Sequence, residues 1–351
     1  MSAQATATAG RRFNPASLAR WETLLVLLLA ALVITGARMS DVFISSRNFA
    51  NLASSVMEVA IMALPMTLII ITGDIDLSVE SMVGLSGAIL GTLMVAGLPL
   101  PIAMVVVLAV GALGGFMNGW LVTRGGLPAL VVTLGTLALF RGLANVLLGP
   151  TVISVWPDWF TEFGFGTIGG SPIPYTLVVF VVLAIVYWAV THGTWLGRQV
   201  FAIGKNKETS RYSGVPVARV RTWLFILSGL VSALAGIILA ARFSSVRNDN
   251  GTGLTLTVVT VVLLGGVDIN GGKGSIPGVV LAVFVLAVLQ NVLRLVGVSS
   301  EYQGIAVGLL LVFSVIVPQL ARQANAAVIR TRGGRRPPAG PVPTGEVNAQ
   351  S

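Results

Sequence analysis

Long apolar runs, separated by short segments of Gly, Pro and polar residues, dominate the chain between residues 21 and 320. A helix needs about 20 mostly apolar residues to cross a bilayer, and most of the runs approach that length. The pattern predicts an all-α, polytopic transmembrane helical bundle of about ten spans. The expected ranges are 21–37, 49–72, 77–97, 100–122, 128–149, 174–191, 222–241, 254–267, 275–296 and 303–320. The range 254–267 is short for a spanning helix.

The basic residues between these ranges indicate an orientation. With the N-terminus placed in the cytoplasm, 16 of the 22 lysines and arginines fall in cytoplasmic segments and four fall outside. Cytoplasmic loops of membrane proteins carry such an excess, so both termini are predicted to be cytoplasmic. The net charge of +9 is scattered over loops, and no nucleic-acid partner is expected.

The composition excludes a soluble class. Hydrophobic residues make up 55% of the 351 and charged residues 10%, whereas about a quarter of an ordinary soluble domain is charged. The chain is therefore expected to lie in lipid. It has no cysteine and a single histidine, His192, so neither disulfides nor a thiolate metal site is possible, and no metal is expected.

Three parts follow from this reading. Residues 1–20 are expected to form a basic cytoplasmic N-tail, and residues 21–320 the transmembrane domain, which includes a cytoplasmic loop at 192–221. Residues 321–351 are rich in Pro, Gly and Ala and basic. Such a composition predicts a disordered cytoplasmic C-tail.

A first polar motif interrupts the apolar pattern between the second and third ranges. Asp74 and Asp76 stand two residues apart, after Gly73 and before Ser78. Asp76 and Ser78 are good N-cap residues, and Glu80 would lie in the first turn of the next helix. In an enzyme the carboxylates would suggest paired acids or a metal site, but no histidine accompanies them, so capping and loop structure are favoured.

A second motif lies in the cytoplasmic loop. Asn206 can cap a short helix, Glu208 suits its N-terminal dipole, and Gly214 followed by Pro216 ends it. The residues predict about two turns of helix outside the membrane.

A third motif is rich in glycine and lies between the eighth and ninth ranges. It contains Gly265, Gly266, Gly271, Gly272 and Lys273. A phosphate-binding loop needs a glycine five residues before the Gly-Lys pair and Ser or Thr after it. This chain has Val267 and Gly274 at those positions. We therefore expect no nucleotide hydrolysis and no cofactor in this chain.

Polar residues inside the predicted spans are candidates for a solute pathway, because such residues are costly in lipid. Glu58 and Arg141 fall at similar depth and are expected to pair. Asn118, Asn145 and Asn291 can hydrogen-bond a sugar. The alternative for each asparagine is a helix–helix hydrogen bond, worth about 0.6 kcal/mol.

Together the motifs resemble the permease subunits of bacterial ATP-binding-cassette importers of the ribose, xylose and galactose type, over approximately residues 45–320. The rhamnose or autoinducer-2 branch is also similar. The matching segments are TGDIDLS at 72–78, Gly204, Asn206, Ser213 and Gly214, then Ala241–Ser245, Gly251–Gly253, Leu264–Gly266, Gly271–Gly274 and Gly297–Ser300. This chain departs from the family pattern at four positions. Asp74 and Pro65 each stand in place of a glycine, and Thr255 and Thr257 stand where the family usually carries Glu and Asp.

The resemblance implies a non-enzymatic permease of the bacterial inner membrane that carries a monosaccharide or a related signal. Its implied partners are a cytoplasmic ATPase, which would hold ATP and Mg, a periplasmic sugar-binding protein, and a second copy or a sister permease. It further implies that Asn206, Glu208, Arg211, Ser213 and Gly214 belong to a coupling helix that docks on the ATPase. The plain alternative is an ordinary basic loop.

Two other classes remain for comparison. An ion-coupled secondary transporter of a small polar solute would use ionisable residues in the membrane, for which Glu58 and Arg141 are available. A membrane-embedded enzyme would need a nucleophile–base set or metal ligands, and the sequence offers none.

Overall fold

The computed structural model describes residues 15–314 and 316, and in these residues the secondary structure is helical apart from two isolated β-bridges. The first half contains α1 (Pro15–Met39), α2 (Ser46–Ser55), α3 (Met57–Ile71), α4 (Val79–Val95), α5 (Leu100–Thr123), α6 (Ala129–Leu148) and α7 (Asp158–Phe165). The second half contains α8 (Tyr175–Trp188), α9 (Trp195–Lys205), α10 (Lys207–Tyr212), α11 (Val217–Phe243), α12 (Leu254–Leu264), α13 (Ile276–Leu295) and a last helix, Ser300–Ser314. A 3-10 turn, η1 (Ile168–Gly170), and a π turn, η2 (Ala189–Gly193), complete the set.

Six of these helices are long and apolar enough to cross a membrane, and α2 with α3, bent by 43°, makes up to seven. Three shorter apolar helices are α4, α12 and Ser300–Ser314. Every predicted range thus contains a helix, and the polytopic all-helical class is confirmed. The short eighth range corresponds to α12, which has 11 residues.

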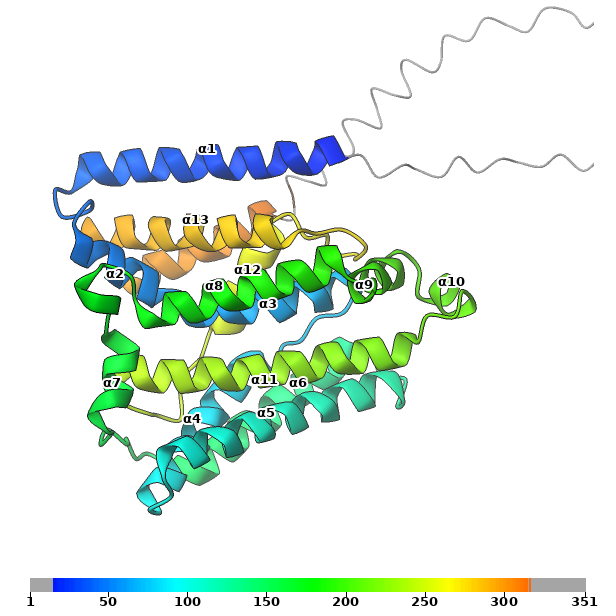
Figure 1. Ribbon diagram of the computed structural model, residues 1–351, viewed down its shortest axis with the longest axis horizontal. Coiled ribbons are helices and arrows are strands. Elements are labelled where there is room, and N and C mark those ends of the chain that lie inside the picture. Colours follow the sequence, from blue (N-terminus) through cyan, green and yellow to red (C-terminus); the bar gives the residue numbers. More distant parts are fainter. Residues whose placement is uncertain (1–14, 315, 317–351) are drawn as a thin grey trace, which may run out of the picture.

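The helix α11 forms the centre of the bundle and packs against α3, α4, α5 and α7 (Figure 1). Small residues allow this packing. A Cβ on Gly115 of α5 would collide with the carbonyl oxygen of Phe225, and one on Gly229 with that of Gly111. Glycines at such contacts let helix backbones approach closely in membranes.

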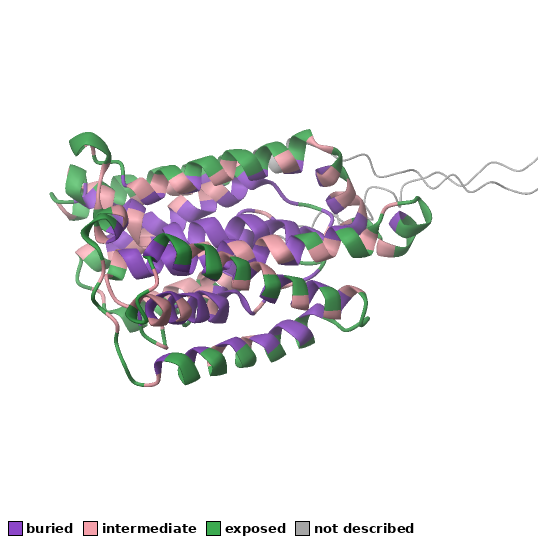
Figure 2. Cartoon of the chain, turned by 60° about the horizontal axis from the view of Figure 1, so that its bottom comes forward, coloured by how far each residue is buried: buried purple, intermediate pink, exposed green. Residues whose placement is uncertain are grey.

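The helix α3 is buried along its whole length, from Met57 to Ile71, among α8, α11, α12 and α13. It contains Pro65, which membrane helices accommodate because neighbouring groups satisfy the freed backbone. Figure 2 shows the buried residues in the interior and the exposed ones along the outward faces of the peripheral helices. Those outward faces are apolar, for example Leu113 on α5 and Val146 on α6, as lipid contact requires.

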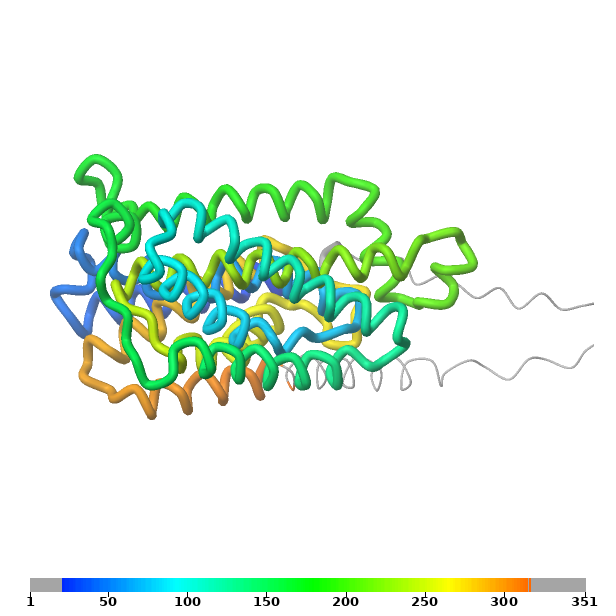
Figure 3. The backbone as a smooth tube through the Cα atoms, turned by 90° about the horizontal axis from the view of Figure 1, so that it is seen from below, coloured from blue at the N-terminus to red at the C-terminus, as the bar shows by residue number. Residues whose placement is uncertain are grey.

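The α9–α10 segment projects beyond the other described helices at one end of the bundle (Figure 3). At the opposite end lie α2 and α7 (Figure 1). Of the predicted tails, residues 1–14 and 321–351 lie outside the described residues, and residues 15–20 belong to α1.

Candidate functional site: a junction of three motifs

The predicted helix of the second motif is present as α10. The side-chain oxygen of Asn206 accepts a hydrogen bond from the backbone N–H of Thr209 at 2.9 Å, so Asn206 is its N-cap. Gly214, with φ +83°, ends the segment in the left-handed conformation that favours glycine. The six residues of α10 make just under two turns.

Most of the surface of α10 is free of contacts with the rest of the chain. Asn206, Glu208, Arg211, Ser213 and Gly214 are all exposed. Sequence reasoning missed Tyr212, which is 89% exposed at the end of this helix. Large exposed aromatic side chains are frequent anchors of protein interfaces. An aromatic residue directly after Arg211 in the predicted helix was the signal by which Tyr212 could have been chosen as a site residue.

Asp74 of the first motif binds two basic residues of the second half of the chain. Arg221 of α11 contacts its carboxylate twice, Nε to Oδ2 at 2.6 Å and Nη2 to Oδ1 at 2.8 Å. Lys207 of α10 donates to Oδ1 at 3.1 Å. Of the capping and loop roles expected for these carboxylates, Asp74 therefore takes a loop role, in which it ties the segment after α3 to α10 and α11. Two-point contacts of this kind fix geometry strongly.

Asp76 is not the N-cap residue of α4 that the sequence suggested, but it binds the residue that occupies that position. Its Oδ1 accepts from the Ser78 backbone N–H at 3.0 Å and from the Ser78 hydroxyl at 2.6 Å, and its Oδ2 accepts from Ser228 of α11 at 2.8 Å. Ser78 occupies the N-cap position, but its side chain makes no capping bond. Instead its hydroxyl also accepts from Asn118 of α5 at 2.9 Å. These four side chains therefore join α4, α5 and α11.

The Gly-rich loop packs directly on the first two motifs. The N–H of Gly272 donates to the carbonyl of Ile71 at 2.8 Å. A Cβ at Gly204 would collide with that same carbonyl oxygen and with the Gly272 nitrogen. Gly271 and Gly272 have φ of +85° and +75°. The loop is a packing element, and the three motifs meet at one place, which we call the junction.

Gly265 and Gly266 also allow close packing, next to α13 and α1. A Cβ on Gly265 would come within 2.6 Å of the Val279 Cα, and one on Gly266 within 2.7 Å of the Trp21 ring. The Trp21 indole donates to the Leu264 carbonyl at 2.9 Å. Lys273, the last residue of the predicted motif, is exposed.

The predicted pair of Glu58 and Arg141 is wrong. Glu58, 2% exposed, binds the Nε of Arg242 at 2.7 Å. The physical reason is helix packing: α3 lies against α11, which carries Arg242, whereas α6, which carries Arg141, packs on α4 and α5. Arg242 directly follows the predicted range 222–241 and counts among the four basic residues assigned to outer segments.

Arg141 instead belongs to a second ionic cluster. Its Nη2 lies 3.2 Å from Glu80 Oε1, and its Nη1 donates to Thr252 at 2.5 Å. The other oxygen of Glu80 accepts from the N–H groups of Gly253 and Thr255, at 3.1 and 3.2 Å. Glu80 thus satisfies free backbone donors at the start of α12 while it pairs with Arg141.

The three asparagines predicted for the pathway take different places. Asn291 of α13 exchanges two hydrogen bonds with Asn48 of α2, at 3.0 and 2.8 Å, and Asn118 bonds Ser78. Both are buried, which favours the helix–helix alternative. Asn145 lies on the exposed face of α6. No group of three His, Asp or Glu side chains suited to a metal occurs in the described part of the chain.

A bundle of apolar helices, a non-helical connection at residues 72–78 and a capped helix projecting from one end fit the membrane subunit of a transporter. Residues 48–315 match the family described as branched-chain amino acid transport system, permease component. The chain belongs to this family.

Curated relatives agree over most of the chain. The autoinducer 2 import system permease protein LsrD of Yersinia enterocolitica is 38% identical over 306 residues, which cover 84% of this chain and 91% of that protein. The LsrD protein of Yersinia pseudotuberculosis is 37% identical over 306 residues, 84% of this chain and 90% of its own length. No solved structure matches the chain. The family and the relatives show a permease subunit of an ATP-binding-cassette importer, a multi-pass inner-membrane protein, as the resemblance implied.

Proposed function

We propose that this chain is the translocating subunit for a small neutral polyhydroxylated solute of the autoinducer-2 or monosaccharide class. The solute would be delivered by a periplasmic binding protein, and transport would be driven by a separate ATPase that holds ATP and Mg, while this chain performs no catalysis. The names of the relatives support the solute class. Family membership speaks against the ion-coupled alternative.

The junction carries the proposal for energy coupling. Lys207 on α10 and Arg221 on α11 hold the same carboxylate, Asp74, at the break between α3 and α4. A displacement of α10 would therefore act directly on two transmembrane helices and on the extended segment that separates them. Transport requires two arrangements of the helices, and the ATPase can bias them only through contacts that differ between the two.

The docking surface on α10 consists of Asn206, Glu208, Arg211, Ser213 and Gly214, to which we add Tyr212. Their exposure and the rigid cap at Asn206 support this role. An aromatic side chain flanked by an arginine has the composition of an interface anchor.

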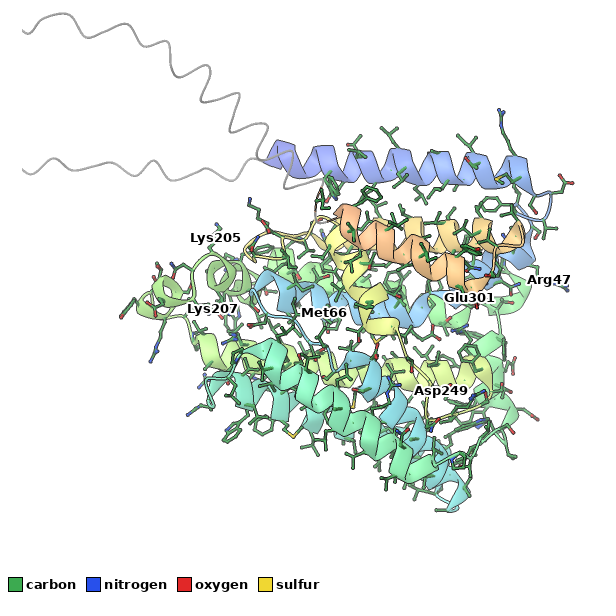
Figure 4. All side chains as sticks on the ribbon, turned by 180° about the vertical axis from the view of Figure 1, so that it is seen from behind. Arg47, Met66, Lys205, Lys207, Asp249 and Glu301 are labelled. Atoms are coloured by element: carbon green, nitrogen blue, oxygen red, sulfur yellow. The ribbon has the colours of Figure 1, made fainter. Side chains whose placement is uncertain are left out.

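For topology, we propose ten crossings with both termini in the cytoplasm. Six are the long helices, one is the bent pair of α2 and α3, and three are the shorter helices α4, α12 and Ser300–Ser314. The distribution of charge supports this orientation. Lys205 and Lys207 lie at one end of the molecule, and Arg47, Asp249 and Glu301 lie at the other (Figure 4). The end with the lysines also carries α10, and it would be the cytoplasmic one.

A second permease, either another copy or a sister chain, is proposed to complete the pore. The exposed face of α6 supports this: Gly135 and Gly142 have no atom within 4 Å of a Cβ position, and Asn145 lies on the same face. Small and polar residues of this kind favour helix association in membranes.

The test is reconstitution in proteoliposomes of the complete permease pair, which includes any sister chain, with the ATPase and the binding protein. Uptake of labelled autoinducer-2 is expected only with all three components and ATP. Uptake driven by a proton or sodium gradient, without ATP and without the ATPase, would refute the proposal. It would show that the chain is an ion-coupled secondary transporter.

A further inference from the structure

A cavity of about 390 Å³ opens between α12, α13 and the Ser300–Ser314 helix. Small-molecule sites have volumes of roughly 300–1,000 Å³. Its wall comes from the first turns of α12, from Gln290 near the end of α13, and from one face of the last helix between Ser300 and Leu311. Glu301, in that start, lies at the end of the molecule opposite Lys207 (Figure 4). The cavity is thus separate from the junction, and none of the five predicted pathway residues lines it.

The polar groups that the described residues contribute to this cavity are all neutral. They are Thr257 and Thr260 of α12, Gln290 of α13, and Ser300 and Gln303 of the last helix, of which Ser300 already donates to Glu301 at 3.2 Å. No charged residue of the described chain lines it. A charged solute would find no counter-ion in this wall, and leaving a charge uncompensated within a membrane protein is costly.

Several of these groups keep hydrogen-bonding capacity. The hydroxyls of Thr257 and Thr260 donate to Gly253 and Leu256, at 3.2 and 2.7 Å, and each retains its lone pairs as acceptors. Gln303 donates through Nε2 to Val298 at 2.9 Å, which leaves its carbonyl oxygen. The side-chain amide of Gln290 makes no hydrogen bond within residues 15–314 and 316. It therefore keeps two donor hydrogens and an acceptor oxygen.

The rest of the wall is apolar or open. Leu256, Val307 and Leu311 contribute aliphatic surface. Gly304 and Gly308 stand one turn apart, and a Cβ on either would have no atom within 4 Å. Aliphatic surface beside neutral donors and acceptors fits a molecule that has C–H faces and hydroxyl edges.

We propose that this cavity is a solute-passage site for a neutral polyhydroxylated molecule, with Gln290 and Thr257 as the residues that determine which solute passes. The inference rests on the proposed function and deepens it. Polar groups in hydrocarbon need a partner, and the hydroxyls of a passing solute supply it. The site holds the solute weakly, since release to the next position must follow binding.

Two kinds of variant test the site in the reconstituted complex. Gln290→Leu and Thr257→Val remove hydrogen-bonding groups at nearly constant volume, and uptake of autoinducer-2 is expected to fall about tenfold for each bond lost in the rate-limiting state. Gly304→Leu fills the cavity without a clash inside the chain, and uptake should be abolished. The control is Ala109→Leu on the exposed face of α5, which introduces the same side chain outside the site and should transport normally.

Access to the cavity provides a second measurement, the rate at which a thiol placed there is modified, which can be followed even in a variant with reduced uptake. The chain has no cysteine, so Thr257→Cys carries the sole thiol. A small water-soluble methanethiosulfonate should modify that thiol and block uptake, and saturating autoinducer-2 with the binding protein should slow modification severalfold. Ala109→Cys should resist the water-soluble reagent.

The outcomes separate the two proposals. If the unmodified complex shows no ATP-driven uptake of autoinducer-2, the proposed function fails. If it transports, and Gln290→Leu, Thr257→Val and Gly304→Leu transport at the same rate while the thiol of Thr257→Cys resists the reagent, the passage site is refuted and the proposed function stands. If a variant does not assemble, as judged by size-exclusion chromatography, its uptake is not used, and the thiol measurement alone decides whether the passage site stands.

Discussion

Arg221 and Asp74 are separated by 147 positions in the sequence, yet the guanidinium of one contacts both carboxylate oxygens of the other, at 2.6 and 2.8 Å. The pair has little exposure, 14% for the Arg221 side chain and 5% for that of Asp74. It therefore fixes the break after α3 to the first turns of α11.

Removing the carboxylate at the junction should weaken both stability and transport. In Asp74→Asn, Arg221 and Lys207 are left facing each other without a counter-ion, and breaking a buried pair in this way costs about 3–5 kcal/mol. We expect a lower Tm in detergent and uptake reduced at least tenfold. The double variant Asp74→Asn, Arg221→Gln should be less damaged than the sum of the single variants. Additive losses would mean that the pair does not act as a unit.

The surface of α10 should be required for transport and dispensable for folding. Glu208→Ala, Arg211→Ala and Tyr212→Ala combined remove exposed side chains, so expression and Tm should stay unchanged. Uptake and stimulated ATP hydrolysis by the assembled complex should both fall more than tenfold. Arg335→Ala with Arg336→Ala serves as the control and should be harmless. Normal uptake in the triple variant would return α10 to the status of an ordinary basic loop.

Glu58 should be energetically linked to Arg242 and not to Arg141. A double-mutant cycle of Glu58→Gln with Arg242→Gln, read as thermal stability, should give a coupling of about 0.5–3 kcal/mol, the range for groups in contact. The same cycle with Arg141→Gln should give a value near zero. A reversed result would contradict the arrangement of α3 and α11.

Thiol labelling can decide the orientation. Cysteines introduced singly at Val155, which is 79% exposed, and at Thr209, which is exposed on α10, lie at opposite ends of the bundle. An impermeant reagent added to spheroplasts should label only the first, and lysis should be needed for the second. Labelling of both before lysis would rule out the proposed ten-span orientation.

Local features could be read from the sequence because their causes lie within a few residues. The cap at Asn206 and the end at Gly214 each depend on chemistry within one or two turns. The helical class followed from the lengths of the apolar runs.

Partnerships across the bundle could not be read in the same way. The sequence predicts Glu58 and Arg141 at the same depth in the membrane. Two residues at one depth touch only if their helices pack together. The neighbour of Glu58 is decided by which helices pack on α3, and Arg242 lies 184 positions away. Asp74 shows the same limit: its flanking residues suggest a cap, whereas its partners come from α10 and α11.

Gly204 has consequences for how the protein is made. It is seated between the carbonyl of Ile71 and the nitrogen of Gly272, which are joined to each other by a hydrogen bond. During synthesis the chain emerges from its N-terminus, so α10 is complete well before Gly272 exists. The complete junction can form only after most of the transmembrane helices have been synthesised. In an unfinished permease, α10 would thus lack the contact that Gly272 supplies beside Gly204, and the surface proposed to dock on the ATPase would reach its final setting only when the membrane domain is nearly complete.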